Sequence, residues 1–389
     1  MKKMPFSVLL SFLLLFNYCK KDKEELLPSS EKIFNEPVPQ GSALIKSDKQ
    51  NFWLDTVAVD LGKPWGMAFL PGGEFLISDR EGRLLLIDPI GNSRVELSGL
   101  PELYIGGQGG LLDIKLHPEY KTNGWIYLSY SKRQDQGFTT AISRCRISGT
   151  RLTDMQELFV AQPSYSTSHH FGCRMNLHQG YLFFSVGDRG QMKDAQKLTT
   201  HNGKVMRIFD DGSIPEDNPF VTIPGSKKEI WAYGHRNPQG MDRHPISGKL
   251  YTHEHGPKGG DELNLEKRGA NYGWPEITFG IDYDGSIISN DTAKEGMEAP
   301  LTYWVPSIAP CGMVIYSGNK YPGWHGDYFI GGLVSRTLFR VELLGDNYRR
   351  QERLLEKLGR VRNVAQSPDG YLYVATENPG VLYRLAPAQ

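Results

Sequence analysis

Two adjacent histidines stand out first among the side chains that could do chemistry. His169 and His170 lie in "STSHHFGCRMNL", directly before a glycine and an alternating apolar run. This order places an imidazole at the end of a strand, where a histidine can act as a general base near neutral pH. The pair alone is equally consistent with a general base and with two exposed or hydrogen-bonded histidines.

Two further segments could position a ligand. Arg236 and Asn237 lie in "WAYGHRNPQGMD", just before a proline that fixes the backbone. An arginine held in this way presents a planar fork to a carboxylate or to an oxygen that gains negative charge. The alternative is a surface salt bridge, which the surrounding Gly, Asn and Pro disfavour. In "YIGGQGGLLDIKLHP", glycines flank Gln108 and would let the backbone approach a flat ligand, although glycine-rich segments also form ordinary turns.

The segment "THEHGPKGGDELNLEKRGANYGWP", residues 252–275, has neither a helical nor a strand period. Ca²⁺ takes oxygen ligands, carbonyls included, in flexible geometry, and an irregular Gly-Pro loop can direct successive carbonyls to one point. Pro257 has no N–H to use in a strand ladder, and Glu262 could supply a carboxylate. The spacing is not that of an EF-hand, and the segment alone slightly favours a solvated turn over a calcium site.

A repeated theme indicates the elements that must position these residues. An alternating apolar run, a Pro/Gly/Asp/His turn and a second run recur six times, starting at Trp65, Leu111, Cys173, Pro238, Gly312 and Val361. With 43 glycines and 24 prolines, the chain is predicted to be all-β, a six-bladed β-propeller. Two stacked β-sandwiches are the competing fold, disfavoured by the regular repeat.

In a propeller, loops that leave the inner strands of different blades converge at one mouth of the central channel. Asp188 and Glu254 follow or end the second run of their repeats, and are therefore candidates for one shared site. The longest insertions, residues 194–230 and 261–310, lie between the third and fifth repeats, where functional sites of repeat folds usually occur.

The bulk composition excludes some partners. The 44 basic and 44 acidic side chains leave no net field to attract nucleic acid or an anionic membrane. Cys145, Cys173 and Cys311 are too far apart for a Cys-x-x-Cys metal site, and buried free thiols are expected.

The N-terminus indicates export. Residues 1–19 combine a basic start, an apolar run and Cys19, residues 20–50 form a charged tether, and residues 51–389 are expected to form the catalytic propeller. The pattern resembles a bacterial lipoprotein signal, so a lipidated Cys19 would attach a periplasmic, outer-membrane or cell-surface protein to its membrane. Plain secretion is the alternative, because "FNYC" lacks the small residues of such a cleavage site.

Several motifs together carry a family resemblance. They are "GGQGGLLDIKLHP", "HFGCRMNL", "FSVGDRG", "GKVMRI", "AYGHRNPQG", "HEHGPKGGDELN", "NYGWP" and "PSIAPCGM". In this order, from about Leu61 to the C-terminus, they resemble the soluble glucose/sorbosone dehydrogenases, in particular the aldose sugar dehydrogenase branch that uses pyrroloquinoline quinone (PQQ). The resemblance implies a six-bladed propeller with the quinone at the channel mouth, oxidising an aldose sugar to an aldonolactone.

The resemblance also implies roles for individual residues. His170 would be the general base, oriented by Asp188, while Arg236 and Asn237 contact the quinone oxygens and Arg236 stabilises the oxygen that becomes negative. Further cofactor contacts would come from Gln108, Tyr283, Arg360 and Arg362. The carbonyls of Gly256 and Pro257 would hold the Ca²⁺ that touches the quinone, and Glu262 with the Tyr272 carbonyl would hold a second Ca²⁺. The sequence names no electron acceptor.

Two positions depart from the family pattern. Val334 stands where a lysine is common, so that one cation near the quinone is missing, and Arg336 is a candidate to replace it. Cys173 stands where glycine is frequent, beside the expected base. These departures keep two other functions open: a non-catalytic cell-surface propeller that binds carbohydrate or protein, and a calcium-dependent propeller lactonase.

Overall fold

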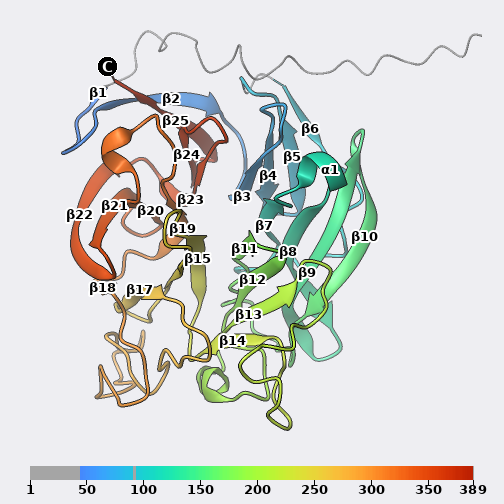
Figure 1. Cartoon of the computed structure of the whole chain (residues 1–389), viewed down its shortest axis with the longest axis vertical. Coiled ribbons are helices and arrows are strands. Elements are labelled where there is room, and N and C mark those ends of the chain that lie inside the picture. The colour runs from blue at the N-terminus through green and yellow to red at the C-terminus, as the bar shows by residue number, and fades with distance from the viewer. Residues whose placement is uncertain (1–43, 91–92, 389) are drawn as a thin grey trace, which may run out of the picture.

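The computed structural model describes residues 44–90 and 93–388. Within these ranges the strands form six antiparallel sheets around a common centre (Figure 1), which confirms the predicted six-bladed β-propeller. The predicted export signal, Cys19 and the tether as far as residue 43 lie outside the described residues. No helix in the described ranges is long and apolar enough to cross a membrane.

Each blade is a meander of four strands, except the last, which has five. Blade 1 comprises β3 (Pro64–Phe69), β4 (Phe75–Asp79), β5 (Arg83–Ile87) and β6 (Arg94–Glu96). Blade 2 comprises β7 (Leu111–Leu116), β8 (Ile126–Gln134), β9 (Gly137–Ser148) and β10 (Arg151–Val160). Blade 3 comprises β11 (Met175–His178), β12 (Tyr181–Val186), β13 (Lys204–Phe209) and β14 (Ile230–Tyr233).

The second half of the ring follows the same plan. Blade 4 comprises β15 (Pro238–Arg243), β16 (Leu250–Glu254), β17 (Asp261–Leu265) and β18 (Thr302–Trp304). Blade 5 comprises β19 (Pro310–Ile315), β20 (Tyr328–Gly332), β21 (Thr337–Leu344) and β22 (Asn347–Glu356). Blade 6 comprises β23 (Arg360–Gln366), β24 (Leu372–Glu377) and β25 (Val381–Pro387) with β2 (Phe52–Ala58) and β1 (Leu44–Ile45). The helical pieces are α1 (Tyr120–Asn123), η2 (Met192–Gln196) and η3 (Pro322–Trp324).

Burial explains why the second strand of each repeat is so apolar. Strands β4, β20 and β24 are buried along their whole length, because each faces a neighbouring blade on both sides. The outer strand β10 is mostly exposed and carries polar residues. The hydrophobic core is therefore divided among the blade interfaces; one cluster joins Leu76 of blade 1 to Ile114 of blade 2, and another joins Phe184 of blade 3 to Ile142 of blade 2.

Both ends of the described chain build blade 6 and so close the ring. Strand β2 pairs with β25, with Leu54 opposite Leu385. Residues 44–50, the last part of the predicted tether, also lie against the propeller, since Lys49 Nζ is 3.1 Å from Asp327 Oδ2 of blade 5. Closure covers the blade faces that the two ends of a linear array would leave exposed.

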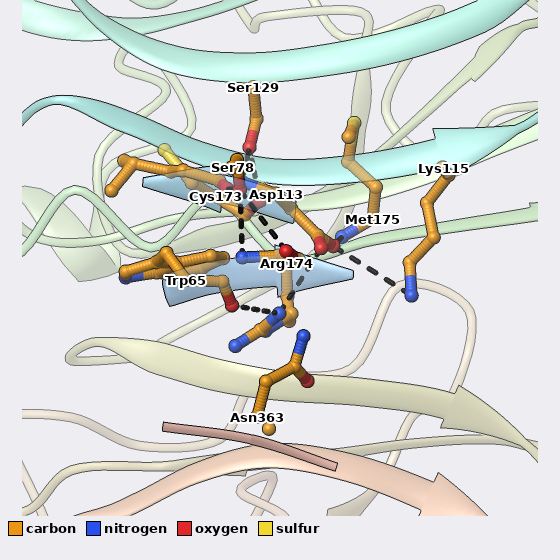
Figure 2. Close-up of polar contacts among 12 residues, drawn as sticks. Trp65, Ser78, Asp113, Lys115, Ser129, Cys173, Arg174, Met175 and Asn363 are labelled. Atoms are coloured by element: carbon orange, nitrogen blue, oxygen red, sulfur yellow. Dashed lines mark hydrogen bonds and ion pairs between the residues drawn. The ribbon is translucent and has the colours of Figure 1, made fainter. Parts of the chain in front are cut away.

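The centre of the channel contains a buried arginine that contacts several blades (Figure 2). Arg174, just before β11, lies 3.1 Å from Asp113 Oδ1 of β7 and donates from Nε to Gln239 O of β15 at 2.9 Å. Its guanidinium lies 3.8 Å from the ring centroid of Trp65 in β3 and 3.7 Å from Cys311 Sγ in β19. Arg174 is 2% exposed and Asp113 is fully buried, so this pair connects the inner strands away from water.

We expect Arg174→Met to lower the free energy of unfolding by about 3–5 kcal/mol, because the variant leaves the buried Asp113 carboxylate with only Lys115 Nζ, 4.0 Å away, as a cation. Chemical denaturation measures the change. The control is Arg146→Met, whose partner Asp154 lies 3.3 Å away at the exposed surface, and which should change stability by less than about 1 kcal/mol. Equal effects of the two substitutions would show that Arg174 does not hold the blades together.

Candidate active site

The inner strands surround a cavity of about 260 Å³ at one end of the channel, called here the channel cavity. Residues from all six blades or their connecting loops line it: Trp65, Arg80, Gln108, Leu112, Phe171, Gly172, Gln239, His255, Ala309, Leu333, Arg360, Arg362 and Glu377. Three of the predicted cofactor contacts, Gln108, Arg360 and Arg362, are therefore brought together although they lie far apart in sequence.

His170 and Asp188 form a direct pair beside this cavity. Asp188, in the loop after β12, accepts from His170 Nδ1 on Oδ1 at 2.7 Å and from Trp274 Nε1 on Oδ2 at 2.8 Å. Burial alone would raise the pKa of Asp188, but the hydrogen bond and charge of His170 and the charge of Arg236 outweigh it and lower that pKa. An ionised carboxylate only accepts hydrogen bonds, so His170 Nδ1 carries the proton.

The other ring nitrogen of His170 is left free to accept a proton. Burial, supported by the charge of Arg236 and opposed by Asp188, lowers the pKa of His170 to about 4. Nε2 has no hydrogen-bond partner among the described residues, and 12% of the side chain is exposed. The His170 N–H donates to Gln108 Oε1 at 2.8 Å, which holds His170 against the wall of the channel cavity. At neutral pH the imidazole is thus uncharged and oriented by Asp188.

Arg236 and Asn237 present unused donors on buried side chains. Arg236 Nη1 donates to the carbonyls of Gly256 at 2.7 Å and His255 at 3.2 Å. In the described structure, Arg236 Nε and Asn237 Nδ2 are buried without a hydrogen-bond partner. A buried donor without a partner is unfavourable, which favours a ligand with acceptor oxygens at this place.

The channel cavity is rich in positive charge. Arg360 Nε lies 2.8 Å from Glu377 Oε1 and Arg362 Nη2 lies 2.9 Å from the same oxygen. Although burial would lower the pKa of Arg362, the nearby Cys311 and Glu377 raise it. Arg80 also lines the cavity, so three guanidinium groups face one carboxylate. This excess of positive charge favours the binding of an anionic ligand.

The predicted calcium residues lie in two adjoining places. Gly256 and Pro257 line an apolar groove of about 470 Å³ at the channel mouth, with Tyr283, Val305 and Val334. Glu262 and Tyr272 line a small interior cavity with Glu254, called here the acidic cavity. Among the described residues, no group of three or more His, Cys, Asp or Glu side chains is placed to hold a metal ion. A calcium site here would therefore need carbonyl oxygens in addition to carboxylates.

Glu254 and Glu262 line the acidic cavity together with Arg236, and His235 and Asn264 contact Glu254 from outside the lining. Burial and then the charge of Glu254 raise the pKa of Glu262 to about 8. Burial would lower the pKa of His235, but Glu266 and Glu254 raise it to about 10, so it is a second cation beside Arg236. Glu266 Oε2 and Asn264 Oδ1 are buried without a partner in the described structure. Unpaired acceptors beside crowded carboxylates fit a hard divalent cation.

The departures from the family pattern have defined positions. Val334 is 62% exposed in the mouth groove and adds no charge there. Arg336, the expected replacement cation, is an exposed turn residue that lines neither the channel cavity nor the groove, so this expectation is wrong. Cys173 is fully buried, and burial raises its pKa to about 12, so no thiolate lies beside His170. Tyr283 lies in the groove but is 68% exposed.

Sequence reasoning missed three residues of this site. Trp274 supports Asp188, His255 lines the channel cavity and donates from Nε2 to Pro310 O at 2.8 Å, and Arg80 lines the same cavity as Arg360 and Arg362. A signal existed for Arg80, which directly follows the second strand of the first repeat, much as Asp188 follows the second strand of the third. No local pattern indicates the role of Trp274, because its partner is 86 residues away.

Comparison with known proteins is consistent with this geometry. Residues 61–384 match the family described as Glucose / Sorbosone dehydrogenase. The chain is 41% identical over 336 residues to aldose sugar dehydrogenase YliI of Escherichia coli K12. The matched region covers 84% of this chain and 91% of the relative. The crystal structure of the soluble aldose sugar dehydrogenase of Escherichia coli in the apo-form covers 86% of this chain and 99% of its own, with 39% identity and a TM-score of 0.82. The PQQ-bound aldose sugar dehydrogenase of Streptomyces coelicolor covers 90% of this chain and 100% of its own, with 27% identity and a TM-score of 0.72.

Proposed function

Because the chain belongs to the glucose/sorbosone dehydrogenase family of oxidoreductases, we propose that it oxidises aldose sugars to aldonolactones with PQQ and Ca²⁺ as cofactors. The observation that carries the proposal is the uncharged His170, held by Asp188 at 2.7 Å beside a cavity lined by arginines. A base, an oriented carboxylate and a cationic pocket are the groups that such an oxidation needs from the protein.

His170 is the base in this proposal. Its free Nε2 takes the proton of the anomeric hydroxyl, and Asp188 stabilises the imidazolium that forms. Arg236 lies close enough to lower the pKa of His170, and its guanidinium stabilises negative charge that develops on an oxygen nearby. When bound, the quinone supplies the electrophilic carbon or oxygen that accepts the hydride equivalent leaving the sugar.

The residues present fit a flat tricarboxylate. Arg360 and Arg362 would hold its carboxylates, and Asn237 Nδ2 and Arg236 Nε, which lack partners among the described residues, would donate to its ring oxygens. Gln108 and Tyr283 would line its faces, from the channel cavity and from the mouth groove respectively.

The residues also fit calcium. Gly256 O accepts from Arg236 Nη1 at 2.7 Å, and because a carbonyl oxygen has two lone pairs, a Ca²⁺ ion would take the second one. We propose that the Gly256 and Pro257 carbonyls hold the Ca²⁺ that touches the quinone, and that Glu262 and the Tyr272 carbonyl hold a second Ca²⁺ that braces the loop.

The reaction is tested with purified apo-protein, Ca²⁺ and PQQ, following aldose-dependent reduction of a redox dye. His170→Asn should lower kcat by about a hundredfold or more, the usual effect of removing a general base, while PQQ still binds. Asparagine is chosen because His170 has a φ of 55°, a left-handed conformation that asparagine tolerates.

The control for this variant is His169→Asn. The His169 side chain has no hydrogen bond to a carboxylate in the described structure, so we expect its replacement to retain turnover. If the enzyme shows no turnover with a broad aldose panel, the oxidation proposal is wrong; hydrolysis of lactones without PQQ would instead indicate a lactonase.

The pH dependence of kcat/KM should report the lowered pKa of His170. The base works only when neutral, so kcat/KM should rise with pH up to about 4 and stay level from about pH 5 to 7. An unperturbed histidine would place this rise near pH 6.5. Steady-state kinetics across this pH range measure the rise, and circular dichroism at each pH shows whether the fold persists. A rise of kcat/KM near pH 6.5 would contradict the assignment of His170.

Calcium should stabilise the protein through Glu262. At about 100 times its dissociation constant, Ca²⁺ adds about 2.7 kcal/mol to the free energy of unfolding, seen as a higher thermal midpoint. Glu262→Gln should reduce this calcium-dependent shift, whereas Glu276→Gln, at an exposed carboxylate paired with Lys294 at 3.1 Å, should leave it unchanged. An equal calcium-dependent shift of the thermal midpoint in both variants would show that Glu262 is not a calcium ligand.

A further inference from the structure

Arg80 occupies a position in the fold that directs it to the channel. It directly follows β4, the second strand of blade 1, and lines the channel cavity. Its backbone is fixed on both sides: its N–H donates to Lys63 O at 3.0 Å, and its carbonyl lies against Gly110. A Cβ at Gly110 would lie 1.7 Å from that carbonyl oxygen, and Gly110 has a φ of 151°, so only glycine permits this approach.

The guanidinium of Arg80 has no partner of its own. Among the described residues, Glu377 is the one carboxylate that lines the channel cavity, and it already binds Arg360 at 2.8 Å and Arg362 at 2.9 Å. The Arg80 side chain makes no hydrogen bond or ion pair with any described residue. Burial and then the charge of Arg362 lower the pKa of Arg80, which means that its charge is poorly compensated.

A structural role does not explain this arrangement. Arginines that stabilise a fold are paired, as Arg83 is with Asp79 at 2.6 Å in the same blade. Arg80 instead adds a third positive group to a cavity that has one negative group. Such a cluster opposes folding unless an anion binds there, which is typical of a binding site.

We propose that Arg80 is a further cofactor-binding residue, which donates from its guanidinium to a carboxylate of PQQ beside Arg360 and Arg362. This inference rests on the proposed function. It also accounts for the chemistry of the mouth, where Val334 provides no cation and Arg336 lines neither the channel cavity nor the mouth groove. A tricarboxylate needs several cationic contacts. Arg80 supplies one from blade 1, whereas Arg360 and Arg362 belong to blade 6.

Binding of PQQ to apo-protein at fixed Ca²⁺, measured by calorimetry or by fluorescence quenching, tests this role without turnover. Arg80→Gln should weaken PQQ binding about tenfold or more, the usual effect of losing a charge-assisted hydrogen bond. Arg80→Lys keeps the positive charge but loses the paired donors of the guanidinium, so it should weaken PQQ binding less than Arg80→Gln does. Arg336→Gln removes the same charge from an exposed position and should bind PQQ like the parent protein.

A second readout separates binding from structure. Without PQQ, the thermal midpoint of Arg80→Gln should equal or exceed that of the parent protein, because repulsion from Arg362 is removed. A lower apo midpoint, or unchanged PQQ affinity, would overturn the role of Arg80. If Arg80→Gln does not fold, its role in the fold is shown and the proposal is overturned. If the parent protein binds no PQQ, the proposed function itself is wrong. If parent and variant bind PQQ equally well, only the role of Arg80 is wrong.

Discussion

The Arg174–Asp113 ion pair in the channel is the interaction on which the site depends most directly. Ion pairs of this kind are costly to bury, and they persist when hydrogen bonds satisfy both partners. Asp113 also accepts from the Met175 N–H at 3.0 Å, and Arg174 holds the Gln239 carbonyl at 2.9 Å. Trp65 stacks on Arg174, and Trp65 and Gln239 both line the channel cavity. These two residues, called here the floor of the cavity, are therefore positioned by the ion pair.

Burial opposes the charged form of both His170 and His235, but the outcome for their pKa values differs with their neighbours. His170 has one carboxylate partner and a nearby arginine, and burial dominates, so that it stays neutral. His235 lies between Glu254 and Glu266, whose attraction exceeds the effect of burial, so that it is charged. The same low-dielectric interior therefore provides a neutral base on one side of Arg236 and an anionic cluster with a protonated histidine on the other. The number of charged neighbours, more than the depth of burial, decides between base chemistry and cation binding.

The fold and part of the site could be predicted from the sequence because the relevant signals are local. Each repeat pairs a buried strand with a turn, and the position of His170 before "FGCRM" or of Arg236 before Pro238 is visible in a few residues. Arg336 shows where local reasoning fails, since it was the candidate to replace the missing lysine, while a turn with a φ of 52° leaves it exposed. Trp274 and Arg80 were missed because their roles depend on which loops from other blades the ring brings beside them.

The segment that carries the base is also the most strained part of the site. His170, Gly172 and Cys173 have φ values of 55°, 67° and 78°, and left-handed backbone at a residue with a side chain costs about 1 kcal/mol or more. Glycine at 172 is required, because a Cβ there would lie 2.8 Å from Gly187 N. Hydrogen bonds from the Gly172 N–H to Asn237 Oδ1 at 3.1 Å and from the Cys173 N–H to Ser185 O at 2.8 Å offset this strain. The conformation is thus imposed by blades 3 and 4 together, and it is this imposed turn that directs the His170 imidazole back onto Asp188. A cysteine at position 173 fits the turn because its small side chain packs into the core with Trp65 and Phe171, away from the base.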